Sequence, residues 1–127
     1  MQSAPTVVLI HGLFGFTRLL WLEYFAQARA LFEQMGMRVV LPSLPWSGSI
    51  EQRACSLAAQ LASEPGPLYL VAHSMGGLDA RCWISHLGGA AKIASLTTLA
   101  TPHRGSPVAD QSVRLFPHSD YLPAFIR

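Results

Sequence analysis

A serine suited to act as a nucleophile lies among small residues in the stretch A-H-S-M-G-G, residues 72–77. This serine is Ser74, and Ala72 and Gly76 lie two positions before and after it. Small neighbours at this spacing are needed where a serine occupies a sharp, strained turn between a strand and a helix, because larger side chains would collide there. Such a turn exposes the hydroxyl for attack on a carbonyl carbon. The chemistry that we expect is acyl transfer.

A second stretch, H-G-L-F-G at residues 11–15, contains the glycines that a matching oxyanion site requires. Glycine lets the backbone turn its N–H groups inward. We expect the N–H groups of Leu13 and Met75 to converge on the oxyanion that forms when a serine attacks a carbonyl group. The glycines do not fit a phosphate-binding loop, because no Lys-Ser/Thr pair follows them.

Strands and helices are predicted to alternate along the chain and to hold these two stretches. Runs of apolar and β-branched residues predict buried strands at 7–10, 38–41, 68–72 and 93–100. Apolar residues at the spacing of one helical face predict helices at 18–35, 50–61 and 75–87. Ser49 and Gln52 form a capping-box signature at the start of the second helix.

Successive strands start about 30 residues apart, which is typical of right-handed βαβ units in a parallel sheet. We therefore predict an α/β fold, a parallel sheet with helices on both faces. Neighbouring strands lie about 4.8 Å apart, so the turns after strands one and three share a site only if those strands are adjacent. The predicted strand order is 2-1-3-4, with the site at the carboxyl ends of the strands.

At these residues the chain resembles the α/β-hydrolase superfamily, and more narrowly the bacterial triacylglycerol lipases. Three stretches carry the resemblance, in matching order and spacing. They are V-V-L-I-H-G-L-F-G-F, L-V-A-H-S-M-G-G-L-D-A-R and L-A-T-P-H-R-G-S-P-V-A-D, and they lie within residues 6–110. The resemblance implies an α/β-hydrolase fold and a lipase or carboxylesterase activity on a small-molecule ester or lipid.

The resemblance also implies roles for individual residues. Ser74 would be the nucleophile that forms an acyl-enzyme, and the backbone N–H groups of Leu13 and Met75 would form the oxyanion hole. The motif-supporting residues would be His11, Gly12, His73 and Gly76. By the same resemblance, His11 and His103 would brace loops rather than transfer protons.

The triad acid and base of this family lie well beyond the segment that ends near Asp110. The sequence ends first, and His118 and Asp120 fall where the family begins the flap over its site. We expect neither the acid nor the histidine to be encoded here, and we expect a C-terminal complement to supply both. A serine without its base is a weak nucleophile, so the isolated chain should be weakly active or inactive.

The domain that we predict is therefore partial. It spans residues 1–127 and is the N-terminal part of the fold, truncated after the strand that follows the elbow helix. The catalytic core would lie at 6–110, followed by an irregular, lid-like tail at 111–127. Two alternatives stay open: a catalytically silent fragment that serves as an interaction or acyl-binding module, and a related acyl transferase or thioesterase.

Composition limits the other classes of function. Of 127 residues, 50% are hydrophobic and 13% are charged, which excludes a disordered chain. The net charge is +2 and the basic residues are scattered, so we expect no nucleic-acid partner. We expect no cofactor and no metal, because Cys55 and Cys82 are isolated. Both cysteines are predicted to be buried, and a disulfide between them is left as an alternative. No signal peptide or transmembrane run is visible, so a soluble protein of unknown location is expected.

Overall fold

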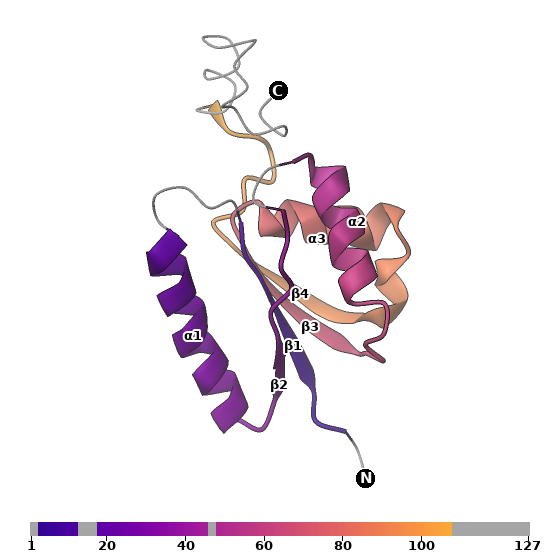
Figure 1. Ribbon diagram of the computed structural model, residues 1–127. Helices are drawn as coiled ribbons and strands as arrows, with labels where there is room; N and C mark the ends of the chain where they lie inside the picture. Colours follow the sequence, from indigo (N-terminus) through magenta and orange to yellow (C-terminus); the bar gives the residue numbers. More distant parts are fainter. Residues whose placement is uncertain (1–2, 13–17, 46–47, 108–127) are drawn as a thin grey trace.

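The computed structural model describes residues 3–12, 18–45 and 48–107, which form four strands and three α-helices (Figure 1). The elements in chain order are β1 Thr6–Ile10, α1 Arg18–Gln34, β2 Arg38–Val40, α2 Ile50–Gln60, β3 Leu68–His73, α3 Gly76–His86, the 3-10 helix η1 Gly89–Lys92 and β4 Ile93–Leu99. All the predicted strands and helices are present, with ends displaced by a few residues. The sequence did not predict η1.

The strands form one parallel sheet in the order β2-β1-β3-β4, as predicted. Val8 in β1 pairs with Val40 in β2 on one side and with Leu70 in β3 on the other. Every residue of β1 is buried, because neighbouring strands flank it and side chains cover both of its faces. The carboxyl end of β1 therefore lies in the middle of the sheet, next to the carboxyl end of β3.

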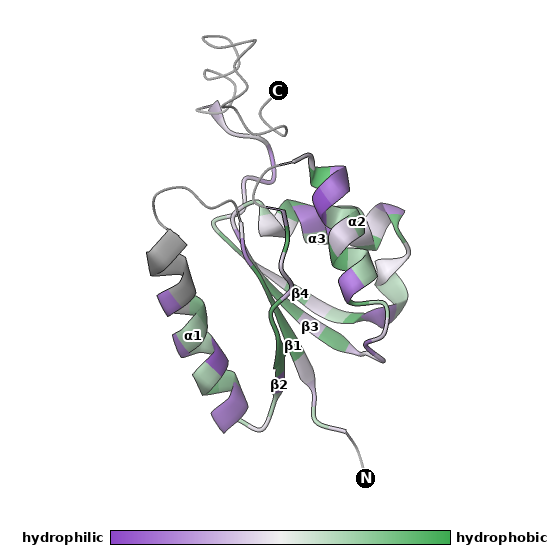
Figure 2. Ribbon diagram, viewed as in Figure 1, coloured by the Kyte–Doolittle hydropathy of each residue, from purple (hydrophilic) through white to green (hydrophobic). Residues whose placement is uncertain are grey.

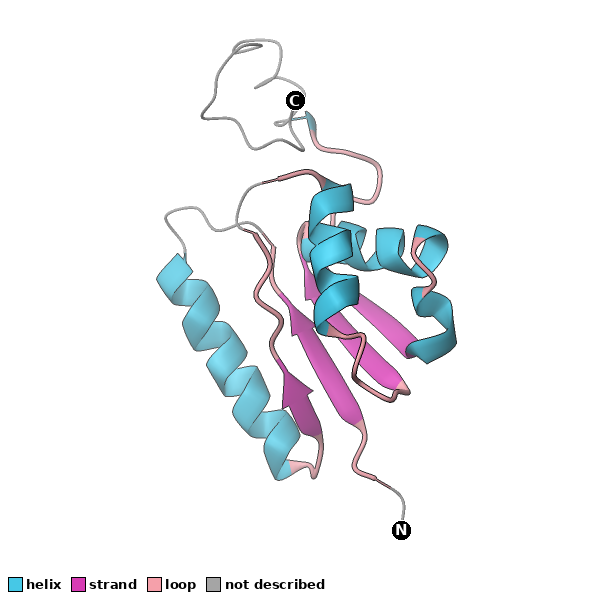
Figure 3. Cartoon of the chain, turned by 45° about the vertical axis from the view of Figure 1, so that its right-hand side comes forward, coloured by secondary structure: helices cyan, strands magenta, loops and turns pink. Residues whose placement is uncertain are grey.

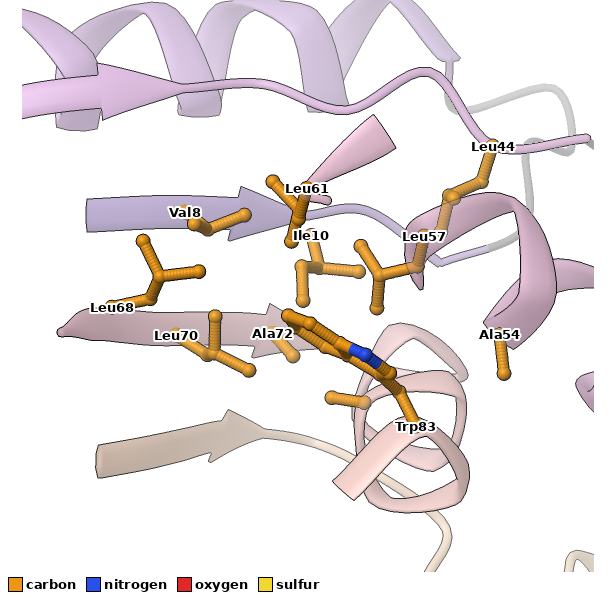
Figure 4. Close-up of a cluster of buried hydrophobic side chains, with 11 residues drawn as sticks. Val8, Ile10, Leu44, Ala54, Leu57, Leu61, Leu68, Leu70, Ala72 and Trp83 are labelled. Carbon is orange, nitrogen blue, oxygen red and sulfur yellow. The ribbon is translucent and has the colours of Figure 1, made fainter. Parts of the chain in front are cut away.

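Helices cover both faces of the sheet: α1 lies over one face, and α2 and α3 lie over the other (Figures 1 and 3). The larger core fills the space beneath α2 and α3, and Figure 4 shows its side chains converging between the strands and these helices. It consists of Val8, Ile10, Leu44, Ala54, Leu57, Leu61, Leu68, Leu70, Ala72, Ala80 and Trp83. Hydrophobic residues accordingly run along β1, β2 and β3 (Figure 2).

The smaller core lies under α1 and is centred on Val7, Leu9 and Phe25. The apolar stripe that predicts α1 is only partly buried, because Leu31 and Met35 are 56% and 65% exposed. Phe32, in the same part of the helix, packs against this core, so Leu31 and Met35 lie beside the covered face of α1 and not on it. Gly36 follows this helix at φ +82°, the left-handed conformation that glycine tolerates at a helix end.

The start of α2 follows the predicted capping box. The Ser49 side chain accepts a hydrogen bond from the Gln52 N–H at 3.1 Å, and the Gln52 side chain accepts one from the Ser49 N–H at 2.9 Å. The prediction that both cysteines are buried is wrong: Cys55 is exposed, Cys82 is half-buried, and both are free thiols. Cys55 points away from the core that Ala54 and Leu57 enter from the same helix. Within the described ranges, no helix is long and apolar enough to span a membrane.

Candidate active site

Ser74 occupies the turn between the last residue of β3 and the first residue of α3. Its φ is +52°, in the left-handed region that L residues other than glycine rarely adopt. A non-glycine residue held in this region stores strain, and such strain is concentrated at functional sites. The sequence prediction of a strained strand-to-helix turn at this serine therefore agrees with the backbone.

The end of β4 holds this turn from two sides. The Ser74 N–H donates to the Leu99 carbonyl oxygen at 2.8 Å, and the Thr101 hydroxyl donates to the Ser74 carbonyl oxygen at 2.7 Å. Ala100, between the two anchoring residues, also has a positive φ, of +53°. The strained serine is therefore fixed by the neighbouring strand and by the loop that follows it.

Two glycines allow the end of β1 to approach the serine turn. A Cβ on Gly76 would lie 2.8 Å from the carbonyl oxygens of both Ile10 and His11, closer than real Cβ atoms come. A Cβ on Gly12 would lie 2.9 Å from the Ser74 Cβ. The turns after β1 and β3 are thus in direct backbone contact, as the predicted strand order requires.

The Met75 N–H lies at this contact, 3.3 Å from the place where a Gly12 Cβ would be. Met75 is the N-cap of α3, and its N–H donates no hydrogen bond to any described residue. Its side chain is buried, at 2% exposure, which fixes the peptide group in place. The positive end of the α3 dipole adds to the attraction for a negative charge here. Leu13, the other predicted oxyanion donor, lies outside the described residues.

His11 is buried and bound to backbone groups through both ring nitrogens. Its Nδ1 donates to the Gly12 carbonyl oxygen at 2.7 Å, and its Nε2 accepts from the Leu44 N–H at 3.3 Å. Burial lowers the pKa of His11, the Gly12 carbonyl opposes this, and the positive Arg53 lowers the pKa further. The ring is therefore neutral and connects the loop after β1 to the loop after β2.

We expect the lowered pKa of His11 to make folding sensitive to acid. Protonation of Nε2 would remove the acceptor of the Leu44 N–H. The stability contributed by the neutral ring is therefore fully present above the pKa of histidine in the unfolded chain, about 6.5. It is lost as the pH falls through the lower pKa that His11 has in the folded protein. Urea unfolding between about pH 7.5 and pH 5 measures this loss as the difference in stability between the parent and His11→Gln, because the raised pKa of Asp79 changes the stability of both proteins in the opposite direction over the same range. As the pH falls, the parent should lose stability relative to His11→Gln but not relative to the matched His86→Gln, on the exposed end of α3. Equal changes relative to both variants would contradict the expectation.

The remaining described histidines do not bind the Ser74 hydroxyl, and no hydrogen bond to that hydroxyl exists within residues 3–12, 18–45 and 48–107. His103 accepts from the Arg81 guanidinium at Nδ1, 3.0 Å away, and its Nε2 lies 3.0 Å from the Thr98 hydroxyl. His73 ends β3 half-buried, and burial lowers its pKa. Asp110, His118 and Asp120 lie outside the described residues.

Sequence reasoning missed a fully buried ion pair beneath the site. Arg53 on α2 donates from Nε to Asp79 on α3 at 2.8 Å, and neither side chain is exposed. The guanidinium also donates to the carbonyl oxygens of His11, at 3.0 Å, and Pro45. It thereby joins two helices to the loops after β1 and β2. Burial raises the pKa of Asp79 to about 6, although Arg53 acts to lower it.

A signal for this pair exists in the helical spacing. Arg53 lies four residues before Leu57, and Asp79 lies four residues before Trp83, so each charged residue shares the buried face of its helix. A charge at a core-facing position predicts a buried partner, because a lone buried charge is strongly destabilising.

Comparison with known proteins agrees with this geometry. A model described as the alpha/beta hydrolase family matches residues 7–127, nearly the whole chain. The chain belongs to the alpha/beta hydrolase family. Within it, the chain is 41% identical to triacylglycerol lipase 2 of Saccharomyces cerevisiae over 117 residues, which cover 84% of the chain and 36% of the lipase.

Other relatives of this alpha/beta hydrolase chain are bacterial triacylglycerol lipases. The identity is 32% with the lipase of Vibrio cholerae, over 86% of the chain and 36% of the lipase, and 32% with that of Pseudomonas fragi, over 83% and 37%. The chain thus spans little more than a third of the length of these relatives.

Solved structures share its fold. The mature form of the Bacillus licheniformis lipase BlEst2 matches with a TM-score of 0.72 at 24% identity, over 88% of this chain and 46% of that one. The metagenomic carboxyl esterase MGS0156 matches with the same score and identity, over 96% and 39%.

The alpha/beta hydrolase fold brings most of the predicted site residues together. His11, Gly12, Ser74, Met75 and Gly76 lie where the ends of β1 and β3 meet, as the contacts at Gly12 and Gly76 show. His73 directly precedes the serine on β3.

Proposed function

We propose that this chain carries the nucleophile of a serine ester hydrolase, of the lipase or carboxylesterase type. The observation that supports this most directly is the Ser74 backbone at φ +52°, on a turn between a buried strand and the start of a helix. A strained backbone of this kind directs the hydroxyl outward from the end of the sheet. The similarity to triacylglycerol lipases favours an ester of a fatty acid, or a smaller carboxylic ester, as the substrate.

The proposed reaction proceeds through an acyl-enzyme. Oγ of Ser74 attacks the ester carbonyl carbon while its proton passes to a general base, and the carbonyl oxygen becomes an oxyanion near the Met75 N–H. Leu13 is proposed to provide a second N–H. The tetrahedral intermediate then breaks its bond to the alcohol, which leaves with the proton. Water, activated by the same base, attacks the acyl-serine and releases the carboxylic acid.

We further propose that an acid and a histidine from a complementary segment complete the triad. The two ring nitrogens of His11 and of His103 are already occupied by other groups. A serine needs an adjacent base to become nucleophilic, and the loss of that base costs about 10⁶ in turnover. The complement would be a C-terminal continuation or a second polypeptide that supplies an Asp and a His.

Labelling with a fluorophosphonate tests the nucleophile. The reagent is applied to two proteins. One is the chain alone, and the other is the chain joined at its C-terminus to the remaining, C-terminal part of one of the triacylglycerol lipase relatives. In the joined protein, mass spectrometry should find the adduct on the tryptic peptide 54–81, which contains Ser74. The chain alone should react about 10⁶ times more slowly.

Matched variants control for non-specific reaction. Ser74→Ala should abolish the adduct, whereas Ser95→Ala, on exposed β4, should leave it unchanged. If the joined, folded protein gives no adduct, or if Ser74→Ala is labelled equally, the proposal is wrong. Circular dichroism establishes that each form is folded.

A further inference from the structure

Thr101 contacts the serine turn through a side chain that the mechanism above does not use. It lies two residues after the end of β4, and its hydroxyl donates to the Ser74 carbonyl oxygen at 2.7 Å. The same carbonyl oxygen accepts a second hydrogen bond, from the Gly77 N–H at 3.1 Å. A carbonyl oxygen has two lone pairs, so it can accept both hydrogen bonds. The bond from the Gly77 N–H alone gives the Ser74 carbonyl oxygen a partner at the start of α3. The Thr101 bond is therefore additional to what the helix end needs.

The fold leaves little freedom to this threonine. A Cβ on Gly77 would lie 2.7 Å from the Thr101 Cγ2, so the Thr101 side chain rests against bare backbone in the first turn of α3. The Thr101 carbonyl oxygen accepts from the His103 N–H at 2.9 Å, which holds the loop from its other side. β-Branched side chains also have few χ1 rotamers. The hydroxyl is thus held in place before any substrate binds.

The bond acts on the peptide group that joins Ser74 to Met75. This group is planar and resonant, so its C=O and its N–H are two ends of one electronic system. A hydrogen bond donated to the oxygen polarises the group and makes its N–H a stronger donor, as occurs along chains of hydrogen bonds. This N–H belongs to Met75, which donates to no described residue and lies at the contact between the turns after β1 and β3, where the oxyanion is proposed to form.

We propose that Thr101 is a positioning residue, whose hydroxyl orients and polarises the Ser74–Met75 peptide so that the Met75 N–H stabilises the oxyanion. This inference rests on the proposed function for its catalytic consequence. Its structural part, the polarised peptide, is independent of any activity. The two parts are therefore tested by two separate measurements.

The first measurement is NMR of the labelled protein. Thr101→Val keeps the shape of the side chain and removes the donor, Thr101→Ser keeps the donor, and Thr97→Val is a matched control on the exposed face of β4. Thr101→Val should shift the Ser74 carbonyl ¹³C and the Met75 amide ¹H and ¹⁵N signals in the direction of a weaker hydrogen bond. Thr101→Ser should restore them, and Thr97→Val should not move them. Unchanged signals in a folded Thr101→Val protein would overturn the inference.

The second measurement is catalysis of ester hydrolysis and fluorophosphonate labelling, made on the form of the protein that contains the complementary Asp and His. Thr101→Val should lower kcat and the labelling rate about tenfold, with KM unchanged, because the lost bond acts on the oxyanion. Thr101→Ser should recover most of this loss, which a packing defect would not allow.

The outcomes separate the inference from the proposed function. If the unchanged protein is labelled at Ser74 and Thr101→Val is labelled equally fast, the inference is overturned and the proposed function stands. If no form is labelled, the proposed function fails, and with it the catalytic role of Thr101. The NMR result then still decides whether the peptide is polarised.

Discussion

Replacing Ser74 by alanine is expected to lower the kcat of ester hydrolysis by about 10⁶-fold when the chain is joined to the proposed complementary segment with its Asp and His. The substitution removes the atom that would form the bond to the acyl group, so no acyl-enzyme can form. What remains is the stabilisation of the oxyanion by backbone N–H groups, typically about 10³ to 10⁴ over the reaction in water. KM should change little, because the alanine leaves the Met75 N–H and the surrounding loops in place.

Two features make this substitution a clean test. Alanine at φ +52° is no larger than the serine it replaces, so the crowded contact with Gly12 is not disturbed. The backbone anchors of the turn, from Leu99 and Thr101, involve the Ser74 main chain alone. The variant should therefore match the parent in its urea midpoint, with Ser95→Ala as the control for activity. A folded Ser74→Ala protein that hydrolyses p-nitrophenyl butyrate at the parent rate would refute the role of Ser74.

Replacing Arg53 by leucine is expected to reduce the free energy of unfolding by about 3 to 5 kcal/mol, because it leaves the Asp79 carboxyl buried without its counter-ion. The guanidinium also binds the carbonyl oxygens of His11 and Pro45, which would lose their donor. Urea unfolding at neutral pH measures the loss. The matched control is Arg38→Leu, since the Arg38 side chain is 55% exposed in its ion pair with Glu64. An exposed pair of this kind contributes at most about 1 kcal/mol.

The pH dependence identifies Asp79 as the source of the loss. Its folded pKa of about 6 is raised from 3.8, so its favourable contribution is present at low pH and is lost as the pH rises through about 6. Arg53 acts to lower this pKa, and without it the pKa should rise further. The deficit of Arg53→Leu should thus be larger at about pH 8 than at about pH 5. Arg53→Leu/Asp79→Leu should recover much of the stability, and a double variant no more stable than the single one would contradict the explanation.

The sequence by itself determined the alternation of elements and the strand-to-helix turn at Ser74, the proposed nucleophile. The signals for these elements are local, because each is encoded within a few consecutive residues. They are the apolar runs of the strands, the capping box at Ser49 and the glycine at the end of α1. The strand order also followed, because two glycine turns that share a site require their strands to be neighbours. The fold and the family were predictable for this reason. The roles assigned to Ser74, Leu13 and Met75, and the boundaries of the partial domain, stay predictions.

Only the tertiary structure decided which side chains support the site. Arg53 and Asp79 are 26 residues apart, and Thr101 and Ser74 are 27 residues apart. Their meeting depends on how α2 packs against α3 and on where the loop after β4 ends, and no local pattern encodes either. The exposure of Cys55 and Leu31 has a similar origin, since a helix covers only as much of the sheet as its own position allows. Local chemistry is set by adjacent residues, whereas the contacts that orient it arise from packing between distant elements.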